Sequence, residues 1–440
     1  MIPKAGLVTL HIGIDDTDSK RAMCTTYVAA IIYEDLLRMG LTPVKRPQLI
    51  RLNPNCPYKT RGNAAVALRF LVNSEKLDKV RETVLDRVYE LAELECDGTE
   101  PGVAFYVGEE IPDKLRDFSI TVVRRMVSVE DAFSVASDVG AELYALKGRR
   151  GVVGALAAVG MEKIPRKTYE LIAYRAKQNW GTLRRVDDDS VIKMDLMTSP
   201  WTFDNFDYET KESRITPHTP CPVLLGIRSL DPDMTFYAFS ILRILEPVER
   251  VLLFETNQAT DLHIQEVKIS DIEENTSVSV EGVVADLPKV MPGGHVFFTL
   301  KDDTGTIQCA AFEPTKSFRN VVRSLRPGDR VRVYGGVKSK PGMPLTINLE
   351  KIQVISLAKY VRVLPPSCNV CGKKMKSLGQ SKGYRCPKCG NRLPEDARIL
   401  VEEQRTLTPG VYTVPPSARR HLSKPPSFEE LASLQEAFEA

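Results

Sequence analysis

The sequence lacks any long apolar run. None of its 440 residues lies in a stretch that approaches the roughly 20 apolar residues needed by a membrane-spanning helix, which argues against a membrane partner. The first residues, MIPKAGLVTLHIGIDDTDS, also lack the long apolar core and the small-residue cleavage site of a signal peptide. We therefore expect a cytoplasmic protein.

The chain also lacks a strong excess of charge of either sign. Its 60 basic and 57 acidic residues leave a net charge of +3, which is too small to identify a partner, so the distribution of charge matters more. The nine cysteines are an odd number and four of them fall in two CxxC pairs, which argues against a disulfide scaffold and favours metal-bound thiolates in a reducing compartment. The sequence does not indicate the oligomeric state.

Hydrophobic periodicity divides the first part of the chain into two α+β units. Residues 8–107 alternate short β-type runs with helical periods in the order βαββαβ, which predicts a ferredoxin-like layer and a first domain over 1–117. A second α+β domain is expected over 118–255. It has a helix from Val129 capped by Ser128, and apolar strands in PVLLGI and MTFYAFSIL.

The remaining chain predicts smaller modules. Short strands punctuated by glycine and aspartate, with one helix around residues 318–324, are typical of an OB-fold barrel over 270–360. A zinc ribbon follows over 365–393. The proline-punctuated tail, 394–440, is expected to be loosely held and to end in one short helix, SFEELASLQEAFEA. The fold class is thus multidomain α+β with a barrel and a zinc ribbon.

The predicted ribbon contains the most specific motif of the chain. The spacing CxxC-x14-CxxC, with a glycine after each pair, predicts two knuckles that place four thiolates around one zinc ion, and iron is the lesser alternative. The four ligands are Cys368, Cys371, Cys386 and Cys389. No acidic residue lies between 368 and 392, so basic side chains such as Lys373, Lys374 and Arg385 predict contact with RNA phosphates, and Tyr384 with a base.

The predicted barrel carries a second basic run. Seven lysines and arginines lie between residues 319 and 340 against one acidic residue, Asp329. We expect Arg330, Arg332 and Lys338 among them to bind RNA. Three phenylalanines are possible stacking faces, although strand neighbours face opposite sides and at least one of each alternating pair belongs to the core. They are Phe297, Phe298 and Phe312.

An acidic motif follows the first predicted strand. Asp15, Asp16 and Asp18, interleaved with Thr17 and Ser19, stand at the end of a strand and before a helix, where carboxylates suit Mg²⁺ bound to nucleotide phosphates. A solvated helix cap is the alternative. Thr25 and Thr26 open the next helix, whose N-terminus favours phosphate, although both are also ordinary cap residues.

Three further segments are candidates for the same site. Lys59 and Arg61 lie on a strand connection and are placed to meet phosphate oxygens, unless this is a plain surface turn. The run GRRGVVGALAAVG, with Gly148, Arg149 and Gly151, only loosely resembles a phosphate loop, and packing of a helix on a sheet explains it equally well. A third segment combines aromatic rings with carboxylates, which suits a cationic amine. Its candidate ligands are Phe203, Asp204, Asn205 and Asp207.

These segments, in this order, resemble the archaeal isoleucine-tRNA 2-agmatinylcytidine synthetase family over nearly the whole chain. The resemblance rests on the barrel, the two CxxC knuckles and the segments GIDDTDS, MCTTY, NPN…KTRGNAAVA, GRRGVVGALAAVG, TFDNFD and PHTPCPVLLGIR. It implies a ligase that uses ATP, converted to AMP, to attach agmatine to carbon 2 of the wobble cytidine of an isoleucine tRNA with the anticodon CAU. The codon read then changes from AUG to AUA.

The resemblance also implies residue roles. Asp15, Asp16 and Asp18 would hold Mg²⁺ and the ATP phosphates, Thr25 would be autophosphorylated, and the TFDNFD segment would hold agmatine. The chain departs from the family pattern in about seven extra N-terminal residues and in the segment PHTPCP, so agmatine contacts near His218 and Cys221 are less firmly implied. The alternative function is a non-catalytic RNA-binding protein built on the barrel and ribbon.

Overall fold

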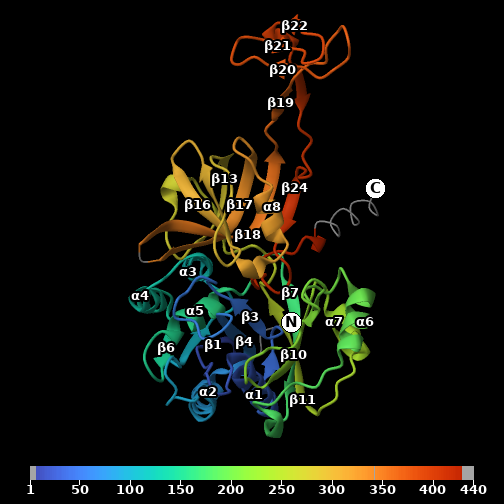
Figure 1. Cartoon of the computed structure of the whole chain (residues 1–440). Helices are drawn as coiled ribbons and strands as arrows, with labels where there is room; N and C mark the ends of the chain where they lie inside the picture. The colour runs from blue at the N-terminus through green and yellow to red at the C-terminus, as the bar shows by residue number, and fades with distance from the viewer. Residues whose placement is uncertain (1–5, 341, 429–440) are drawn as a thin grey trace, which may run out of the picture.

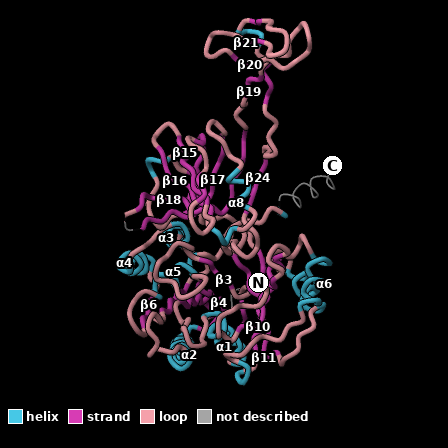
Figure 2. Tube along the Cα trace, viewed as in Figure 1, coloured by secondary structure: helices cyan, strands magenta, loops and turns pink. Residues whose placement is uncertain are grey.

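The computed structural model describes residues 6–340 and 342–428. A large α+β body carries a β-barrel, and a small strand-and-loop module projects beyond the barrel on a two-stranded stalk (Figure 1). The α-helices gather around the α+β body, whereas the two outer modules consist mainly of strands and loops (Figure 2). Within the described residues, no helix is both long and apolar enough to cross a membrane.

The first unit has the predicted βαββαβ order, with one additional two-residue strand, β2, before β3. Its strands pair antiparallel in the order β3-β4-β1-β5, which is the ferredoxin-like arrangement, so this part of the predicted fold is confirmed. The elements are β1 (Leu7–Asp15), α1 (Thr25–Arg38), β2 (Thr42–Pro43), β3 (Gln48–Arg51), β4 (Ala64–Asn73), α2 (Leu77–Leu91) and β5 (Gly102–Val107).

The second unit extends the same sheet on both sides. Strand β6 joins β5, and β11 pairs parallel with β3 and antiparallel with β7, which pairs with β10. The two units therefore share one continuous sheet. The elements are α3 (Asp113–Arg124), α4 (Val129–Val139), β6 (Glu142–Ala145), α5 (Gly151–Gly160), β7 (Thr168–Arg175), α6 (Asp188–Thr198), β8 (Phe206–Asp207), β9 (Glu212–Ser213), β10 (Val223–Ser229), α7 (Pro232–Ile241) and β11 (Val248–Thr256).

The two faces of the sheet carry side chains of different size. Large residues of β1 and β4, such as Ile12 and Phe70, pack under α1 and α2, while small residues, such as Ala65 and Ala67, lie under α5. Since strand neighbours face opposite sides, this alternation lets α5 approach the sheet closely.

Two local predictions in the second unit have opposite outcomes. Helix α4 begins after Ser128 with a capping box, as predicted. The strand expected for MTFYAFSIL is wrong, because these residues form α7. Asp231 caps this helix by accepting a hydrogen bond from the Met234 amide, and Pro232 fits its first turn. These two start signals outweigh the aromatic residues that favour a strand.

The barrel closes in the manner of an OB-fold. Its strands run in the order β13-β17-β18-β16-β15, and β15 pairs back with β13, so the prediction is confirmed. Phe298 lies in its core. The elements are β12 (Ile264–Glu266), β13 (Ser277–Val284), β14 (Lys289–Val290), β15 (Val296–Lys301), β16 (Thr306–Ala311), α8 (Phe318–Arg323), β17 (Arg330–Lys340) and β18 (Met343–Ser356).

The chain leaves the barrel through a stalk and returns through it. Strands β19 (Val361–Leu364) and β23 (Ile399–Glu402) pair antiparallel and form the stalk. Between them, β20 (Lys376–Ser377), β21 (Tyr384–Arg385) and β22 (Arg392–Leu393) form the small sheet of the ribbon.

The expectation of a loosely held tail is wrong. Strand β24 (Gly410–Thr413) pairs with β18, and before it the Arg405 guanidinium lies 2.8 Å from a carboxylate oxygen of Asp329, which is fully buried. A buried carboxylate needs such a partner. The helix predicted for SFEELASLQEAFEA falls mainly on residues 429–440, which lie outside the described residues.

Removing this anchor should destabilise the barrel. Deleting one partner of a buried ion pair costs about 3–5 kcal/mol, so Arg405→Ala should lower the free energy of unfolding by this amount in urea titrations. Arg398→Ala, which removes an exposed arginine 4.0 Å from Glu395, is the control and should change it by less than about 0.5 kcal/mol. Equal stability of the two variants would show that the tail contributes little to the barrel.

Candidate active site

The acidic motif lies in a tight turn at the end of β1. Asp16 has a φ of 55°, a left-handed conformation that aspartate tolerates better than most residues. Helix α5 lies directly over the turn, and a Cβ placed on Gly154 would be 1.8 Å from an Asp15 carboxylate oxygen. Only glycine at position 154 therefore permits Asp15 to sit beneath this helix.

Burial changes the acidity of the first two carboxylates. It raises the pKa of Asp15 well above its usual range, and the neighbouring charge of Asp16 raises it further. Burial likewise raises the pKa of Asp16 to about 7, against the opposing effect of Arg150, whose guanidinium lies 3.6 Å from it. Two crowded carboxylates that resist ionisation are suited to a divalent cation, whose charge would stabilise both anions.

Asp18 has a different role, because it holds the start of α1. One of its carboxylate oxygens accepts hydrogen bonds from the Thr25 amide at 2.8 Å and the Thr25 hydroxyl at 3.2 Å. Thr17 also donates to the Thr25 hydroxyl, at 3.2 Å. The Thr25 side chain is therefore fixed at the N-terminus of a helix, next to the turn that carries the carboxylates.

A cavity of about 310 Å³, here called the carboxylate cavity, opens beside the turn. Its polar part includes Asp15, Asp16, Lys59 and Arg150. Its other part is apolar and comes from the loop after β3 and from the α3–α4 region, and it includes Leu52, Val122, Met126, Val127 and Val129. An apolar recess joined to carboxylates and basic side chains fits a nucleotide with its phosphates and a metal ion.

A second cavity of about 410 Å³, here called the arginine cavity, lies on the other side of Thr25. Arginines from both α+β units line it, together with Glu170 of β7. They are Arg51, Arg61, Arg214 and Arg228. Since Asp18, Thr25 and Arg61 line both cavities, the Thr25 hydroxyl lies on the wall between them.

Some of the predicted phosphate ligands line a cavity, whereas others only shape the turn. Lys59 and Arg61 line the carboxylate cavity, and Thr26 lines the arginine cavity. Thr17 is fully buried, while the Ser19 hydroxyl accepts hydrogen bonds from two backbone amides at 3.0 and 3.1 Å, so both shape the turn.

The glycine run contributes through other residues than those predicted. Gly148, Arg149 and Gly151 are not among the residues that line either cavity, and the Arg149 guanidinium lies over the Phe133 ring at 4.5 Å. Arg150 and Gly154 of the same run do line the carboxylate cavity. The sequence indicated the segment but not which face of its helix meets the carboxylates.

The predicted agmatine ligands lie beside the arginine cavity and contact the end of the chain. Asp204 pairs with Arg419, and Asp207 accepts a hydrogen bond from the Ser417 amide at 2.9 Å. Phe203 meets Phe428 edge to face at 5.0 Å, and Asn205 donates to Asp195 at 3.0 Å. None of the four predicted ligands lines either cavity. They are Phe203, Asp204, Asn205 and Asp207.

Arg228 connects this cluster to the arginine cavity. The Arg228 guanidinium lies 3.8 Å from Asp204 and 3.8 Å from Glu170, and both Arg228 and Glu170 line the arginine cavity. His218 and Cys221, which carry the departure from the family pattern, line this cavity too. Hydrogen bonds from Cys24 and Thr219 lower the pKa of the Cys221 thiol to about 5.

The basic residues of the barrel predicted to bind RNA have partners within the fold that are remote in sequence. Arg330 and Arg332 both pair with Glu281, the latter at 2.8 Å. Lys338 donates to the Asn275 side chain at 2.8 Å and to the Asn55 carbonyl, which joins the barrel to the α+β body. Arg330 and Arg332 therefore share one carboxylate within the fold, whereas Lys338 is held by uncharged groups.

The aromatic residues of the barrel separate into core and surface. Phe298 is buried, whereas Phe297 and Phe312 line a recess of about 330 Å³ together with Lys338. Their rings meet edge to face at 5.9 Å. A recess with aromatic walls and a cationic rim is a suitable receptor for an unstacked base.

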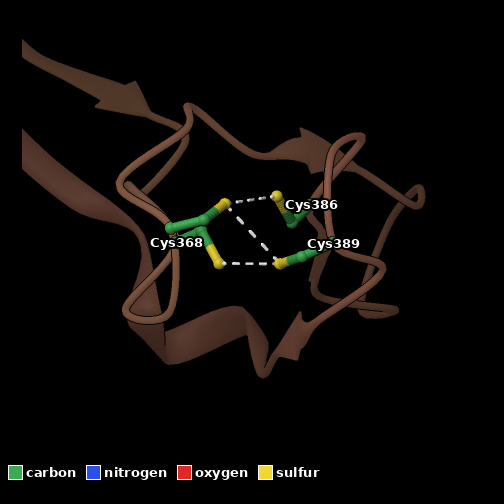
Figure 3. Close-up of side chains that lie close together, drawn as sticks. Cys368, Cys386 and Cys389 are labelled. Atoms are coloured by element: carbon green, nitrogen blue, oxygen red, sulfur yellow. Dashed lines mark hydrogen bonds between the residues drawn. The ribbon is translucent and has the colours of Figure 1, made fainter.

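The four cysteines of the ribbon converge on one point (Figure 3). Their sulfur atoms lie 3.4 to 3.6 Å apart in three pairs, close to the separation of about 3.8 Å expected for thiolates around tetrahedral zinc. Gly372 and Gly390 have φ values of 70° and 75°, as each knuckle requires. This donor set fits a zinc ion.

The ribbon surface differs from the prediction at one residue. Lys373, Lys374 and Arg385 are exposed and available to phosphates, but Tyr384 is buried against Met375 and the cysteines. The expectation that this tyrosine stacks on a base is therefore wrong, because its ring fills the small core of the ribbon.

Family models match four segments of the chain. They are described as the TiaS TCKD domain over residues 11–77, the TiaS FLD domain over 149–263, an OB-fold nucleic acid binding domain over 278–355, and the TiaS C-terminal zinc ribbon domain over 365–407. Together they match parts of both α+β units, most of the barrel, and the ribbon.

Full-length relatives agree with these models. The tRNA(Ile2) 2-agmatinylcytidine synthetase TiaS of Pyrococcus horikoshii is 48% identical over 94% of this chain and 96% of its own. The corresponding protein of Methanocaldococcus jannaschii is 43% identical over 95% and 98%.

Solved structures show the same similarity. The crystal structure of apo TiaS has a TM-score of 0.85 at 41% identity, and its match covers 95% of this chain and 97% of that one. A TiaS–tRNA(Ile2)–AMPCPP–agmatine complex has a TM-score of 0.82 at 38% identity, covering 95% and 96%. The resemblance seen in the sequence is thus confirmed, and this chain belongs to the TiaS family of tRNA(Ile2) 2-agmatinylcytidine synthetases.

Proposed function

We propose that this protein is an ATP-dependent ligase that attaches agmatine to carbon 2 of the wobble cytidine of an isoleucine tRNA with the anticodon CAU. Relatives that match over their full length carry this activity in their names, and related structures contain the tRNA with ATP, or with an ATP analogue and agmatine. The modified tRNA would read AUA in place of AUG. The reaction takes place in the cytoplasm, where the tRNA is used.

The observation that carries this proposal is the pair of cavities that meet at Thr25. A ligase of this kind brings together a nucleotide, a cytosine and an amine, and one cavity cannot hold all three. The carboxylate cavity suits the nucleotide, with its base in the apolar recess and its phosphates towards Lys59, Arg61 and Arg150. The arginine cavity then receives the cytosine and the amine.

The chemistry requires an activated oxygen. The carbonyl oxygen at carbon 2 of cytosine is a poor leaving group, and transfer of a phosphoryl group to it makes displacement by an amine feasible. Asp15 and Asp16 would hold Mg²⁺ together with the ATP phosphates, with Asp18 nearby. The ion would neutralise the charge that moves during transfer. Their shared burial is consistent with a carboxylate pair adapted to a cation.

Thr25 is the residue we assign to a phosphoryl-enzyme form. Its hydroxyl is held by Asp18 at 3.2 Å, so a carboxylate is in place to accept the hydroxyl proton. Its amide stands at the N-terminus of α1, which favours a phosphate on this side chain.

Agmatine recognition is assigned to the cluster around Asp204. Agmatine carries a guanidinium group. Asp204 already forms ion pairs with two such groups, those of Arg419 and Arg228. Asp207 and Phe203 add a carboxylate and a ring to the same segment. We infer that agmatine enters the arginine cavity and reaches this cluster at the position of Arg228, which contacts both.

The barrel and the ribbon would hold the tRNA. The recess formed by Phe297 and Phe312 offers stacking surfaces, and Arg330, Arg332 and Lys338 lie on the same module. The ribbon, with Lys373, Lys374 and Arg385 exposed, stands on its stalk far from the α+β body whose residues line the two cavities (Figure 1). It therefore serves contacts beyond the anticodon.

The first test is the reaction itself. Purified protein with Mg²⁺, ATP, agmatine and the unmodified tRNA should give a wobble cytidine whose mass increases as expected for agmatine in place of oxygen. Thr25→Ala should reduce product formation by at least about 100-fold, because a positioned nucleophile is lost. Thr83→Ala, on the exposed face of α2, is the matched control. RNA binding without any mass change would favour the non-catalytic alternative.

Binding of Mg²⁺ should depend on pH through Asp16. Its pKa of about 7 means that the metal-free protein holds a proton there at pH 6, and the metal must displace this proton. Affinity for Mg²⁺, measured by calorimetry with a non-hydrolysable nucleotide, should rise with pH by up to about tenfold per unit below pH 7 and level off above it. Asp16→Asn should remove the part of the slope that comes from Asp16, whereas any part from Asp15, whose pKa is also raised, would remain. An affinity independent of pH would contradict the assignment.

The metal of the ribbon can be removed separately. Cys386→Ala should lose the zinc found by elemental analysis, whereas Cys96→Ala, outside the ribbon, should retain it. The Cys386 variant should bind tRNA more weakly and bind ATP normally, because the cavities lie in the other part of the molecule. Visible absorption and an iron content in place of zinc would show the lesser alternative.

A further inference from the structure

The segment 414–424, here called the return segment, completes the arginine cavity from the far end of the chain. It follows β24 and runs between the barrel and the α+β body. His421 of this segment lines the arginine cavity together with Thr25 and Arg51. A residue in the tail thus shares a cavity with the start of the first helix.

The return segment is held firmly at this place. The Ala259 amide donates to the His421 carbonyl at 2.8 Å, and the Asp261 amide donates to the Leu422 carbonyl at 2.9 Å. Arg420 lies 3.0 Å from Glu350 of the barrel and donates to the Asn55 side chain at 2.6 Å. Contacts on both sides of His421 therefore fix its position without using its ring.

The ring of His421 has one nitrogen atom that the described part of the fold leaves without a hydrogen bond. Its Nδ1 atom is buried and has no hydrogen-bond partner among the residues that the structure describes. A Cβ placed on Gly62 would be 3.3 Å from Nε2 and 2.7 Å from the Arg51 guanidinium, so both side chains reach the same point of the cavity wall. A buried polar atom without a partner is unfavourable in the fold alone.

The charges around the ring are mainly positive. The positive charge of Arg51 lowers the pKa of His421 well below its usual value. Burial lowers it further, as do the charges of Arg228, Lys59 and Arg214. The imidazole is therefore neutral and able to accept a proton or a hydrogen bond. A phosphoryl group in the same cavity would offset the guanidinium charges and make the ring more basic.

Other proton acceptors of the cavity already have partners. Asp18 accepts from Thr25, and Glu170 pairs with Arg51 at 3.2 Å. The Cys221 sulfur accepts hydrogen bonds from Thr219 and Arg184, each at 3.4 Å. His218 is exposed and also lines a neighbouring surface recess. His421 differs from these groups, because it lines the cavity and its Nδ1 atom has no partner in the part of the chain that the structure describes.

We propose that His421 is a catalytic residue that accepts the proton lost by the attacking amine. This inference rests on the proposed function. The amine of agmatine enters as the free base after losing one proton to solvent, and its lone pair forms a bond to carbon 2 of the phosphorylated cytosine. The bond from carbon 2 to the phosphorylated oxygen breaks, phosphate leaves with the electron pair, and one N–H proton passes to the imidazole.

The test separates the two half-reactions in single-turnover experiments with the full-length protein and tRNA. His421→Ala and His421→Asn should slow conversion of the phosphorylated cytidine to the agmatine adduct by about 100-fold. The rate of phosphoryl transfer from ATP and the affinity for tRNA should change by less than about threefold, and the temperature of thermal unfolding should not change. Phosphorylated tRNA should therefore accumulate. With His421→Gly, added imidazole should restore the second step.

Three results would overturn the assignment of His421. They are a second step that is unchanged in both variants, equal losses in both half-reactions, which indicate a structural role, and a loss confined to His218→Ala. If the wild-type protein itself forms no adduct, then the proposed function fails, and this outcome is distinct from an effect of the variants.

Discussion

Helix α5 lies against strand β1 at a distance that only glycine allows, and the site depends on this close approach. A Cβ on Gly13 would be 1.9 Å from the Ala155 carbonyl oxygen, and one on Gly154 would be 1.8 Å from Asp15. Alanines on the same face of the sheet keep the gap small. The helix therefore covers the carboxylates, removes water from them and raises their pKa values, which makes a cation the natural partner of this turn.

The same turn connects the carboxylates to the second cavity. Asp18 is the third carboxylate of the motif, yet it binds the N-terminus of α1 and so holds Thr25 between the two cavities. Arg61 donates to the backbone of Ser19 at 2.6 Å and borders both cavities. The short segment from Asp15 to Thr25 thus brings the residues proposed as metal ligands and nucleophile together, and Arg61 joins them from the connection between β3 and β4.

The end of the chain unites the modules. Arg405 anchors it to the barrel, Arg420 links the barrel to the loop after β3, and Arg419 reaches the cluster around Asp204. The ribbon precedes this part of the chain and stands on its stalk (Figure 1), so the chain passes through the ribbon before it reaches the arginine cavity. The ribbon and the wall of the arginine cavity are therefore linked by a short stretch of chain.

Local patterns in the sequence were sufficient for much of this architecture. The alternation of apolar residues predicted the βαββαβ order and the barrel strands, and the cysteine spacing predicted the metal centre, because each signal lies within one element or one pair of turns. Helix α7 was predicted as a strand because its aromatic residues masked the cap formed by Asp231 and Pro232.

Long-range contacts were beyond the reach of these patterns. Arg419 and Asp204 are 215 residues apart, and His421 is a single histidine in a proline-rich stretch. Neither has a local signal. In the same way, the glycine run pointed to a phosphate site, but only the packing of α5 shows that Arg150 and Gly154 face the cavity while Arg149 does not.

The most direct measurement of the central claim follows the oxygen at carbon 2 of the wobble cytosine. A tRNA carrying ¹⁸O at this atom is incubated with the protein, ATP, Mg²⁺ and agmatine until the adduct forms. Activation by a phosphoryl group across Thr25 predicts that the label appears in inorganic phosphate. Label in AMP would show that an adenylyl group activates the oxygen, and this would contradict phosphoryl activation at Thr25.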